Sequence, residues 1–286
     1  MTTFNGTSGN DTLTGTTGND TFNPGNGNDT IDGVSGTDTV VFGSARSNYN
    51  IAQTFTGYEV KDTVGSTGTK TISNVDLLQF SDKVYNLNIA TDAKLLSTTQ
   101  LNSLTELYVA FFNRVPEAGG FDYWIKELAG GKSMNDIAQS FYNAGVQYSS
   151  VTGFSAGMTD QDFINVFYKN VLGRAEGADA GGLSYWNGKL ADGSSTRWSL
   201  AQDILASAHT FKGNATWGYV ADLLDNKVTV GTYHAVTAGI DYLTSTETLN
   251  QGLAIAAKVT ATDTSAAIDL IGVATQTDFQ SPPMPV

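Results

Sequence analysis

An aspartate recurs every nine residues at the start of the chain, and this spacing constrains the fold more than any other feature. The aspartates are Asp11, Asp20, Asp29 and Asp38. A glycine lies two positions before each of them, at Gly9, Gly18, Gly27 and Gly36. An apolar side chain lies two positions after each, at Leu13, Phe22, Ile31 and Val40. A fixed period of this kind predicts a solenoid in which short strands alternate with glycine-rich turns.

Two units complete one coil of such a solenoid, so each strand stacks on the strand two units further along. Asp11 is then expected about 4.8 Å from Asp29, and Asp20 at the same spacing from Asp38. Two bare carboxylates at that distance repel by about 3 kcal/mol at an effective dielectric near ~20. Residues 1–45 contain five Asp and no Lys or Arg, so nothing within the segment neutralises these rows. The pattern therefore predicts bound cations.

The ligands available in this segment are oxygens, because residues 1–45 contain no His and no Cys. Carboxylate and carbonyl oxygens favour Ca²⁺ over transition metals. The aspartates are expected to supply some ligands and the carbonyls of the glycine turns the others. Four units form two stacked pairs, which predicts about two calcium sites. The site framed by Asp20 and Asp38 is expected to be the poorer one, because Val34 crowds its turn.

The unit G-x-x-G-x-D-x-apolar-x resembles the RTX (repeats-in-toxin) calcium-binding nonapeptide over residues 6–41. It departs from the fuller form G-G-x-G-x-D, because Thr7, Thr16 and Val34 replace the second glycine and Gly25 keeps it. The resemblance implies a parallel β-roll that binds Ca²⁺. It also implies a secreted bacterial protein whose roll stays unfolded at cytosolic calcium and passes unfolded through a one-step secretion channel.

The composition changes after residue 45, and residues 46–92 are predicted to form a strand-rich segment that caps the roll. Runs of β-branched and aromatic residues between glycine turns predict strands at 39–42, 49–52, 58–60 and 70–72. The five residues before the array leave its N-terminal end with a strand edge that could pair with another chain.

From residue 93 the apolar pattern takes the helical period, and two copies of one motif predict a duplicated helical domain over 93–215. The first copy contains Tyr108, Arg114, Gly119, Gly120, Tyr123 and Trp124. The second contains Tyr168, Arg174, Gly181, Gly182, Tyr185 and Trp186. Ser133 and Ser195 are predicted to cap the helices that follow. The pattern resembles a helical domain of unknown function that occurs beside RTX repeats in bacterial surface-layer and exported proteins.

Residues 216–286 are expected to form C-terminal helices and a Pro-rich tail at 281–286. The fold class predicted for the whole chain is α+β and multidomain: a calcium-binding parallel β-roll of residues 1–45, its strand-rich cap, and an α-helical domain with two internal repeats.

The aromatic and basic residues of the helical motif allow two interpretations. Trp124 and Trp186 either pack in the core, where the Gly-Gly pairs permit close approach, or form platforms for a sugar. In the second interpretation Arg114 and Arg174 contact the same glycan, while in the first they bridge their loops through nearby carboxylates.

Charge and composition exclude several classes of function. The net charge is −13, and no basic stripe suited to nucleic acid is present. No apolar run approaches the roughly 18 residues of a membrane span. The N-terminus lacks the basic and apolar regions of a cleaved signal peptide, so export without one is expected. The match of 153–157 to G-x-S-x-G lacks the preceding apolar strand that a nucleophile elbow requires, so no enzyme is predicted.

These features predict a secreted, calcium-dependent structural protein that associates with itself into a surface layer or an extracellular filament. The alternative is a cell-surface adhesin that binds glycan or lipopolysaccharide. A secreted hydrolase is the remaining possibility.

Overall fold

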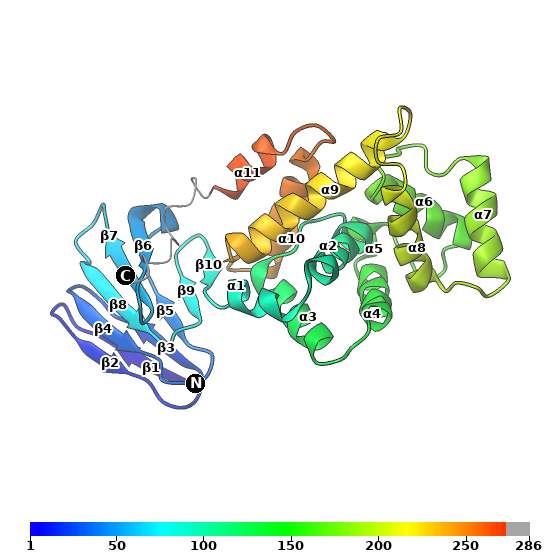
Figure 1. Cartoon of the computed structure of the whole chain (residues 1–286). Helices are drawn as coiled ribbons and strands as arrows, with labels where there is room; N and C mark the ends of the chain where they lie inside the picture. The colour runs from blue at the N-terminus through cyan, green and yellow to red at the C-terminus, as the bar shows by residue number, and fades with distance from the viewer. Residues whose placement is uncertain (273–286) are drawn as a thin grey trace, which may run out of the picture. The chain divides into compact units, whose positions relative to one another are not determined.

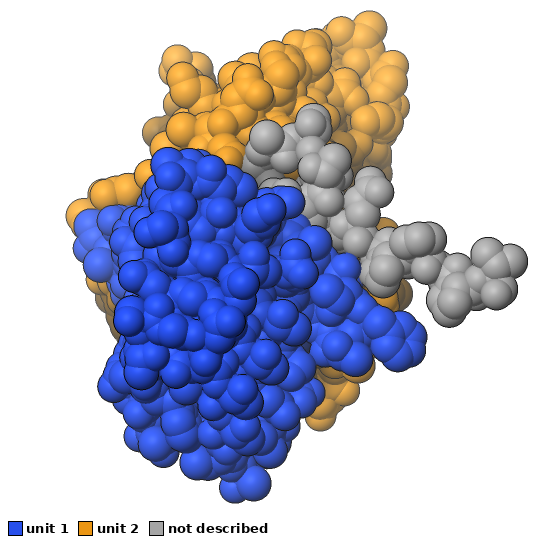
Figure 2. Space-filling view, turned by 90° about the vertical axis from the view of Figure 1, so that its left-hand side faces the viewer, with its two compact units in different colours: residues 1–90, 238–248, 273–286 blue, residues 91–237, 249–272 orange. Residues whose placement is uncertain are grey.

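A computed structural model describes residues 1–272 of the chain, so the predicted Pro-rich tail at 281–286 lies outside the described residues. The described chain is α+β, with strands in its N-terminal region and helices after them (Figure 1). Contacts divide it into two compact units, coloured separately in Figure 2. Unit 1 contains residues 1–90 and 238–248, and unit 2 contains residues 91–237 and 249–272.

Unit 1 is built from two sheets. The first has the order β1 (Thr2–Asn5), β3 (Asp20–Asn23), β5 (Thr39–Val41), β9 (Leu77–Gln79), β10 (Val84–Asn86) and β11 (Ile240–Asp241). The second has the order β2 (Thr12–Thr14), β4 (Asp29–Asp32), β8 (Thr69–Ser73), β7 (Tyr58–Asp62) and β6 (Tyr49–Gln53). Successive strands from β1 to β5 therefore alternate between the sheets, as Figure 1 shows.

The first five strands form what we call the N-terminal solenoid, residues 2–41. Its strands pair in parallel with partners eighteen residues apart, for example Phe4 with Phe22 and Leu13 with Ile31. Phe22, Ile31 and Val40 are fully buried, because each coil places its apolar residue between the two sheets. The expected stacking of units two apart is thus present in the strand register.

Both sheets continue beyond the solenoid. Strand β8 pairs in parallel with β4, and β9 pairs in parallel with β5. The antiparallel strands β6 and β7 precede β8 in the chain and continue the second sheet beyond it, in the order β8, β7, β6. The strands expected at 49–52, 58–60 and 70–72 are therefore confirmed, and they extend the stack as well as covering its end.

Strand β11 was not predicted from the sequence, which indicated only helices beyond residue 216. It pairs antiparallel with β10, joining Ile240 to Tyr85. A short segment from late in the chain therefore completes the first sheet of unit 1.

The helices of the described chain are α1 (Ile89–Asp92), α2 (Thr98–Phe112), α3 (Ala118–Ala129), α4 (Met134–Gln147), α5 (Ser149–Thr152), α6 (Asp160–Asn170), α7 (Ala180–Ala191), α8 (Arg197–His209), α9 (Gly218–Thr232), α10 (Ser245–Lys258) and α11 (Ser265–Ile271). Short 3₁₀ segments occur at Arg46–Asn48 and Ala93–Leu95, and a π segment at Tyr233–Thr237.

Capping residues set several of these helix starts. Ser133 caps α4 in a reciprocal capping box with Asp136, as predicted. The prediction for Ser195 is wrong, because α8 is capped by the next residue, Thr196. Ser195 instead donates a hydrogen bond from its hydroxyl to Asp203, at 2.9 Å.

The core of unit 2 is aromatic and includes Phe154, the second residue of the G-x-S-x-G match. Phe154 is fully buried and packs on Phe111, Phe163 and Phe167, with ring centroids 5.6 to 5.8 Å apart. The residues before Gly153 form helix α5, so the strand that a nucleophile elbow needs is not there. The motif positions a core phenylalanine.

Candidate calcium site

The glycine-rich turns of unit 1 lie in two stacks, which we call turn stack A and turn stack B. Turn stack A contains residues 5–11, 23–29 and 64–70. Turn stack B contains residues 14–20, 32–38 and 73–76. A Cβ on Gly27 would lie 2.3 Å from the carbonyl oxygen of Gly9, and one on Gly36 would lie 2.7 Å from that of Gly18. The glycines of the repeat therefore lie against each other in successive turns of a stack, and the space between these turns leaves no room for a side chain.

The carboxylates of Asp20, Asp29 and Asp38 each use one oxygen to accept a hydrogen bond from the backbone eighteen residues earlier. Asp29 accepts a hydrogen bond from the amide of Asp11 at 2.9 Å, and Asp38 accepts one from the amide of Asp20 at 2.8 Å. The predicted pairs, Asp11 with Asp29 and Asp20 with Asp38, are thus adjacent in the structure. Asp20, Asp29 and Asp38 are each no more than 1% exposed.

In the first two repeats of the array, the second carboxylate oxygen of the aspartate accepts hydrogen bonds from its own turn. Asp11 accepts hydrogen bonds from the amide and hydroxyl of Thr7, at 2.6 and 3.0 Å. Asp20 accepts the same pair of hydrogen bonds from Thr16, at 2.6 and 2.8 Å. These bonds, and above all the one from the Thr16 amide, hold the pKa of Asp20 below its usual range. The threonines that replace the second glycine of the repeat therefore supply the hydrogen bonds that these two carboxylates need.

In the last two repeats of the array, the second carboxylate oxygen of the aspartate has no such hydrogen bond from its own turn. Gly25 and Val34, which replace those threonines, have φ values of +76° and +74°. Oδ2 of Asp38 is buried without a hydrogen-bond donor among the described residues, and Oδ2 of Asp29 is buried with the ammonium of Lys70 as its neighbour, at 2.7 Å. A buried carboxylate oxygen is costly to leave in this state unless a cation compensates it.

Asp38 is influenced by three other carboxylates. Burial raises the pKa of Asp38, and the neighbouring carboxylates of Asp76, Asp20 and Asp32 raise it further against the lowering effect of the Asp20 amide. Val34 is exposed, so its side chain does not fill this turn, but its φ of +74° is one that glycine favours, and the expectation of a poorer site stays a prediction. The site that the sequence marked as the poorer one is the one whose charge is uncompensated.

Asp29 has a cation beside it that the sequence analysis missed. Nζ of Lys70 lies 2.7 Å from Oδ2 of Asp29, and both side chains are buried. The expectation that the carboxylate rows lack a cationic neighbour held for residues 1–45 but fails for unit 1 as a whole. A signal was present, since Lys70 begins a predicted strand, but its register against Asp29 could not be read from the repeat.

The donors around Asp38 suit a hard cation. The carboxylates of Asp76, Asp20 and Asp32 influence its pKa, and a Cβ on Gly33 would meet both Oδ2 of Asp38, at 2.5 Å, and the carbonyl oxygen of Asn74, at 2.0 Å. Carboxylate and carbonyl oxygens are the ligands of Ca²⁺. Across residues 1–272, no three acidic or histidine side chains are grouped closely enough to hold a metal by themselves. A calcium ion at Asp38 would therefore draw part of its shell from turn carbonyls, as the sequence analysis expected.

Comparison with protein families agrees with this donor set. Residues 5–40 match the RTX calcium-binding nonapeptide repeat, in four copies. The chain carries RTX calcium-binding repeats. The ion of this RTX array is Ca²⁺, and such repeats are typical of extracellular, secreted proteins. Among the residues that the structure describes, no helix has the length and apolarity needed to cross a bilayer.

A second family match lies in unit 2, where residues 149–213 match a domain of unknown function, DUF4214. The matched segment includes the second copy of the helical motif and not the first. This confirms the predicted combination of RTX repeats with a helical domain of unknown function. A search of curated proteins found no match to the chain.

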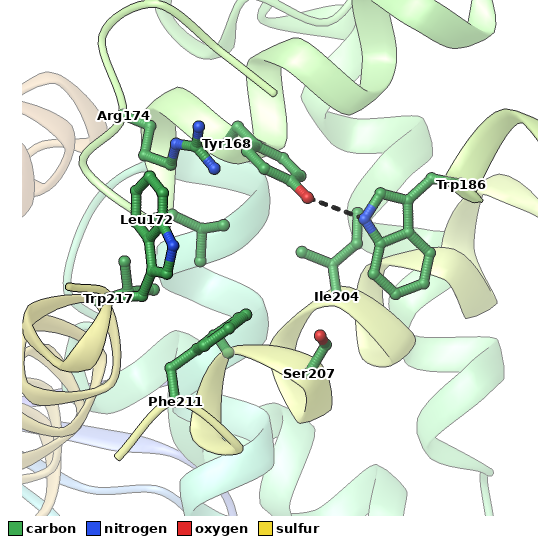
Figure 3. A pocket seen from close by; sticks show the side chains of 10 residues that line it. Tyr168, Leu172, Arg174, Trp186, Ile204, Ser207, Phe211 and Trp217 are labelled. Atoms are coloured by element: carbon green, nitrogen blue, oxygen red, sulfur yellow. Dashed lines mark hydrogen bonds between the residues drawn. The ribbon is translucent and has the colours of Figure 1, made fainter. Parts of the chain in front are cut away.

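The glycan candidates of the second motif copy are largely buried. Trp186 is 5% exposed and donates a hydrogen bond from its indole to the hydroxyl of Tyr168 at 2.9 Å. Figure 3 shows these two groups facing each other, with Arg174 lying against Trp217, 4.4 Å from its ring centroid. The cavity lined by Tyr168, Arg174, Trp186 and Trp217 encloses about 40 Å³. That volume is far below the roughly 300 Å³ of a small ligand site.

In the first copy, Trp124 is half-buried and packs on Phe141, with ring centroids 5.1 Å apart. Arg114 forms an ion pair with Glu117 and lies 5.1 Å from the ring centroid of Tyr108. The corresponding pair in the second copy joins Arg174 to Asp179 at 3.1 Å. Both arginines thus bridge their loops in the manner of the first interpretation.

One polar cluster of unit 2 was not recognised in the sequence. Nε2 of His209 lies 2.7 Å from Oε1 of Glu106, and its Nδ1 lies 3.3 Å from Oδ1 of Asp225. Burial raises the pKa of Glu106 against the lowering effect of His209. Within residues 1–272 no hydrogen bond joins a histidine to the hydroxyl of Ser155, so this cluster does not complete a hydrolytic dyad there.

Proposed function

We propose that this protein is a secreted, calcium-dependent structural protein that assembles with itself into a surface layer or an extracellular filament. Calcium completes the N-terminal solenoid outside the cell, and the assembled solenoid and helical faces form the lattice contacts. In this scheme residues 1–45 bind calcium, 46–92 cap the solenoid, and 93–215 form a duplicated helical domain followed by C-terminal helices.

The buried Oδ2 of Asp38 supports the calcium requirement. It has no hydrogen-bond donor among the described residues, and burial together with the charges of Asp76, Asp20 and Asp32 raises the pKa of Asp38. Folding the solenoid without a cation leaves this charge uncompensated. In the low calcium of the cytosol the coils that depend on Asp38 would remain unfolded, which suits export, and their folding would follow arrival outside.

The end of the solenoid supports self-association. Strands β1 and β2 stand at the ends of their sheets in the strand order, and they carry the half-buried apolar residues Phe4 and Leu13. A strand edge of this kind offers unpaired backbone groups to another chain. A second copy has the same two edges and the same apolar residues.

The test is electron microscopy combined with size-exclusion chromatography of the purified chain, with calcium and with a chelator. We expect ordered assemblies in calcium and their dissociation after chelation. Monomers under both conditions would refute the structural role. Asp38→Asn should need a higher calcium concentration to assemble, whereas exposed Asp160→Asn in unit 2 should behave as the parent does.

A further inference from the structure

The third turn of stack A repeats the geometry of the second turn although it lies outside the RTX array. A Cβ on Gly68 would lie 2.3 Å from the carbonyl oxygen of Gly27, which is the distance found between Gly27 and Gly9. The side chain of Asn28 accepts a hydrogen bond from the amide of Thr69 at 2.9 Å, just as Asn10 accepts one from Asn28 at 2.8 Å. The segment 64–70 is therefore a further turn of the same stack.

Lys70 stands in this third turn at the position that aspartate holds in the first two. The strand register pairs it directly with Asp29, which is itself eighteen residues after Asp11. Turn stack B keeps the acidic residue at the equivalent place, because Asp76 accepts a hydrogen bond from the amide of Asp38 at 2.6 Å. The two stacks thus end in opposite charges.

The ammonium group of Lys70 is surrounded by oxygens from two consecutive turns. It donates to the carbonyl of Gly27 at 2.7 Å and to the carbonyl of Thr67 at 2.6 Å, and it lies 2.7 Å from Oδ2 of Asp29. One carboxylate and two turn carbonyls are the donor types expected of a calcium site in this solenoid. Lys70 is 2% exposed, so water does not share this shell.

We propose that Lys70 is a built-in cation that takes the place of a calcium ion between the second and third turns of stack A. This end of the solenoid is then closed without metal, while stack B, which ends in Asp76, depends on calcium. The pairing of β4 with β8 provides a metal-independent base on which the remaining coils fold when calcium arrives. The inference rests on the calcium binding of the proposed function and does not need the self-assembly.

The first test is hydrogen exchange of the full chain in chelator. Amides of β4 and β8 should stay protected in the parent, whereas those of β3 and β5, the strands of the first sheet that follow the turns of stack B, should exchange and regain protection in calcium. Equal loss of protection in both sheets would overturn the inference. This comparison uses the parent protein, so it does not depend on the folding of any variant.

The second test exchanges the cation. Lys70→Met should lower the protection of β4 and β8 by about 100-fold, because one partner of a buried ion pair is removed. Lys70→Asp restores the acidic residue of the repeat and should bind one more calcium ion per chain, counted by equilibrium dialysis with metal analysis. The control is Lys61→Met, an exposed lysine on β7.

The outcomes separate the two proposals. A parent that binds calcium, together with Lys70→Asp that binds no additional ion, would overturn the role of Lys70 and leave the calcium-dependent function standing. A parent that binds no calcium would refute the proposed function and this inference with it. One additional ion in Lys70→Asp, with calcium restoring the protection of β4 and β8, is the expected result.

Discussion

The amide of Asp38 donates a hydrogen bond to a carboxylate oxygen of Asp76 at 2.6 Å, so the aspartate ladder of turn stack B extends beyond the RTX array. The other carboxylate oxygen of Asp76 accepts from the side chain of Asn88 at 2.5 Å. Asp38 itself keeps one buried oxygen without a hydrogen-bond donor among the described residues. The contrast between these two carboxylates supports the proposal that Asp38 is the principal calcium ligand of this stack.

Asp38→Asn should therefore have opposite effects with and without calcium. Calcium affinity should fall by about tenfold or more, which corresponds to 1.4 kcal/mol per factor of ten. In chelator the variant should be at least as stable as the parent, because a neutral amide removes a buried charge from beside Asp20, Asp32 and Asp76. Hydrogen exchange of residues 1–90 in both conditions measures the two effects.

Asp62→Asn is the matched control in the same unit. Asp62 accepts hydrogen bonds from the amides of Val64, Gly65 and Thr67. These bonds hold the pKa of Asp62 well below its usual range, and the bond from the Gly65 amide contributes most. This variant should lose protection equally in calcium and in chelator. If Asp38→Asn behaved like Asp62→Asn, the carboxylate of Asp38 would be a structural hydrogen-bond acceptor and not a calcium ligand.

The sequence was sufficient to predict the contacts within the repeat array, but not the contacts between the array and the strands that follow it. A nine-residue period specifies the neighbour two units away, so the burial of Phe22, Ile31 and Val40 followed from the pattern. The antiparallel strands β6 and β7 then interrupt the period, and no repeat remains to predict that Lys70 meets Asp29. For the same reason the contact of His209 with Glu106, 103 residues away, could not be foreseen.

The Gly-Gly pair of the second helical motif should tolerate a methyl group at one position only. A Cβ on Gly182 would lie 2.7 Å from the hydroxyl oxygen of Tyr168, whereas a Cβ on Gly181 would lie 3.4 Å from Oδ1 of Asp179. Gly182→Ala should destabilise unit 2 by about 1–3 kcal/mol through overpacking. Gly181→Ala should be neutral or stabilising by up to about 1 kcal/mol, because alanine favours the helix.

Tyr168→Phe provides the check on that mechanism, because it removes the clashing hydroxyl. Alone it should cost about 1 kcal/mol for the lost hydrogen bond from Trp186. Combined with Gly182→Ala, the two changes should cost less than their sum in chemical denaturation. Strict additivity would show that the destabilisation arises elsewhere in α7.

Trp186→Ala should destabilise unit 2 by about 3–5 kcal/mol, because the indole is buried. Trp186→Phe should retain most of the stability and lose mainly the hydrogen bond to Tyr168. Both are measured by denaturation, with glycan arrays run on the folded variants. A Trp186→Ala protein that folds normally but loses binding to a glycan would instead establish the adhesin alternative.

Lys227 should give unit 2 a stability that rises in alkali. Burial lowers the pKa of Lys227 to about 8, and its ammonium donates to the carbonyl of Asn170 at 3.0 Å. The unfolded chain therefore binds a proton more tightly than the folded chain between pH 8 and about 10.4, so this group opposes folding below pH 8 and ceases to do so as the pH rises. The penalty is at most about 3 kcal/mol, from 1.36 kcal/mol per pKa unit.

Lys227→Met removes that penalty and should lack this pH dependence. Denaturant titrations followed by tryptophan fluorescence should show the variant gaining most over the parent at pH 7 to 8, with the gain shrinking toward pH 10. Lys169→Met, an exposed lysine on α6, should track the parent throughout. A constant difference between Lys227→Met and the parent from pH 7 to 10 would mean that Lys227 is as readily protonated in the folded chain as in water.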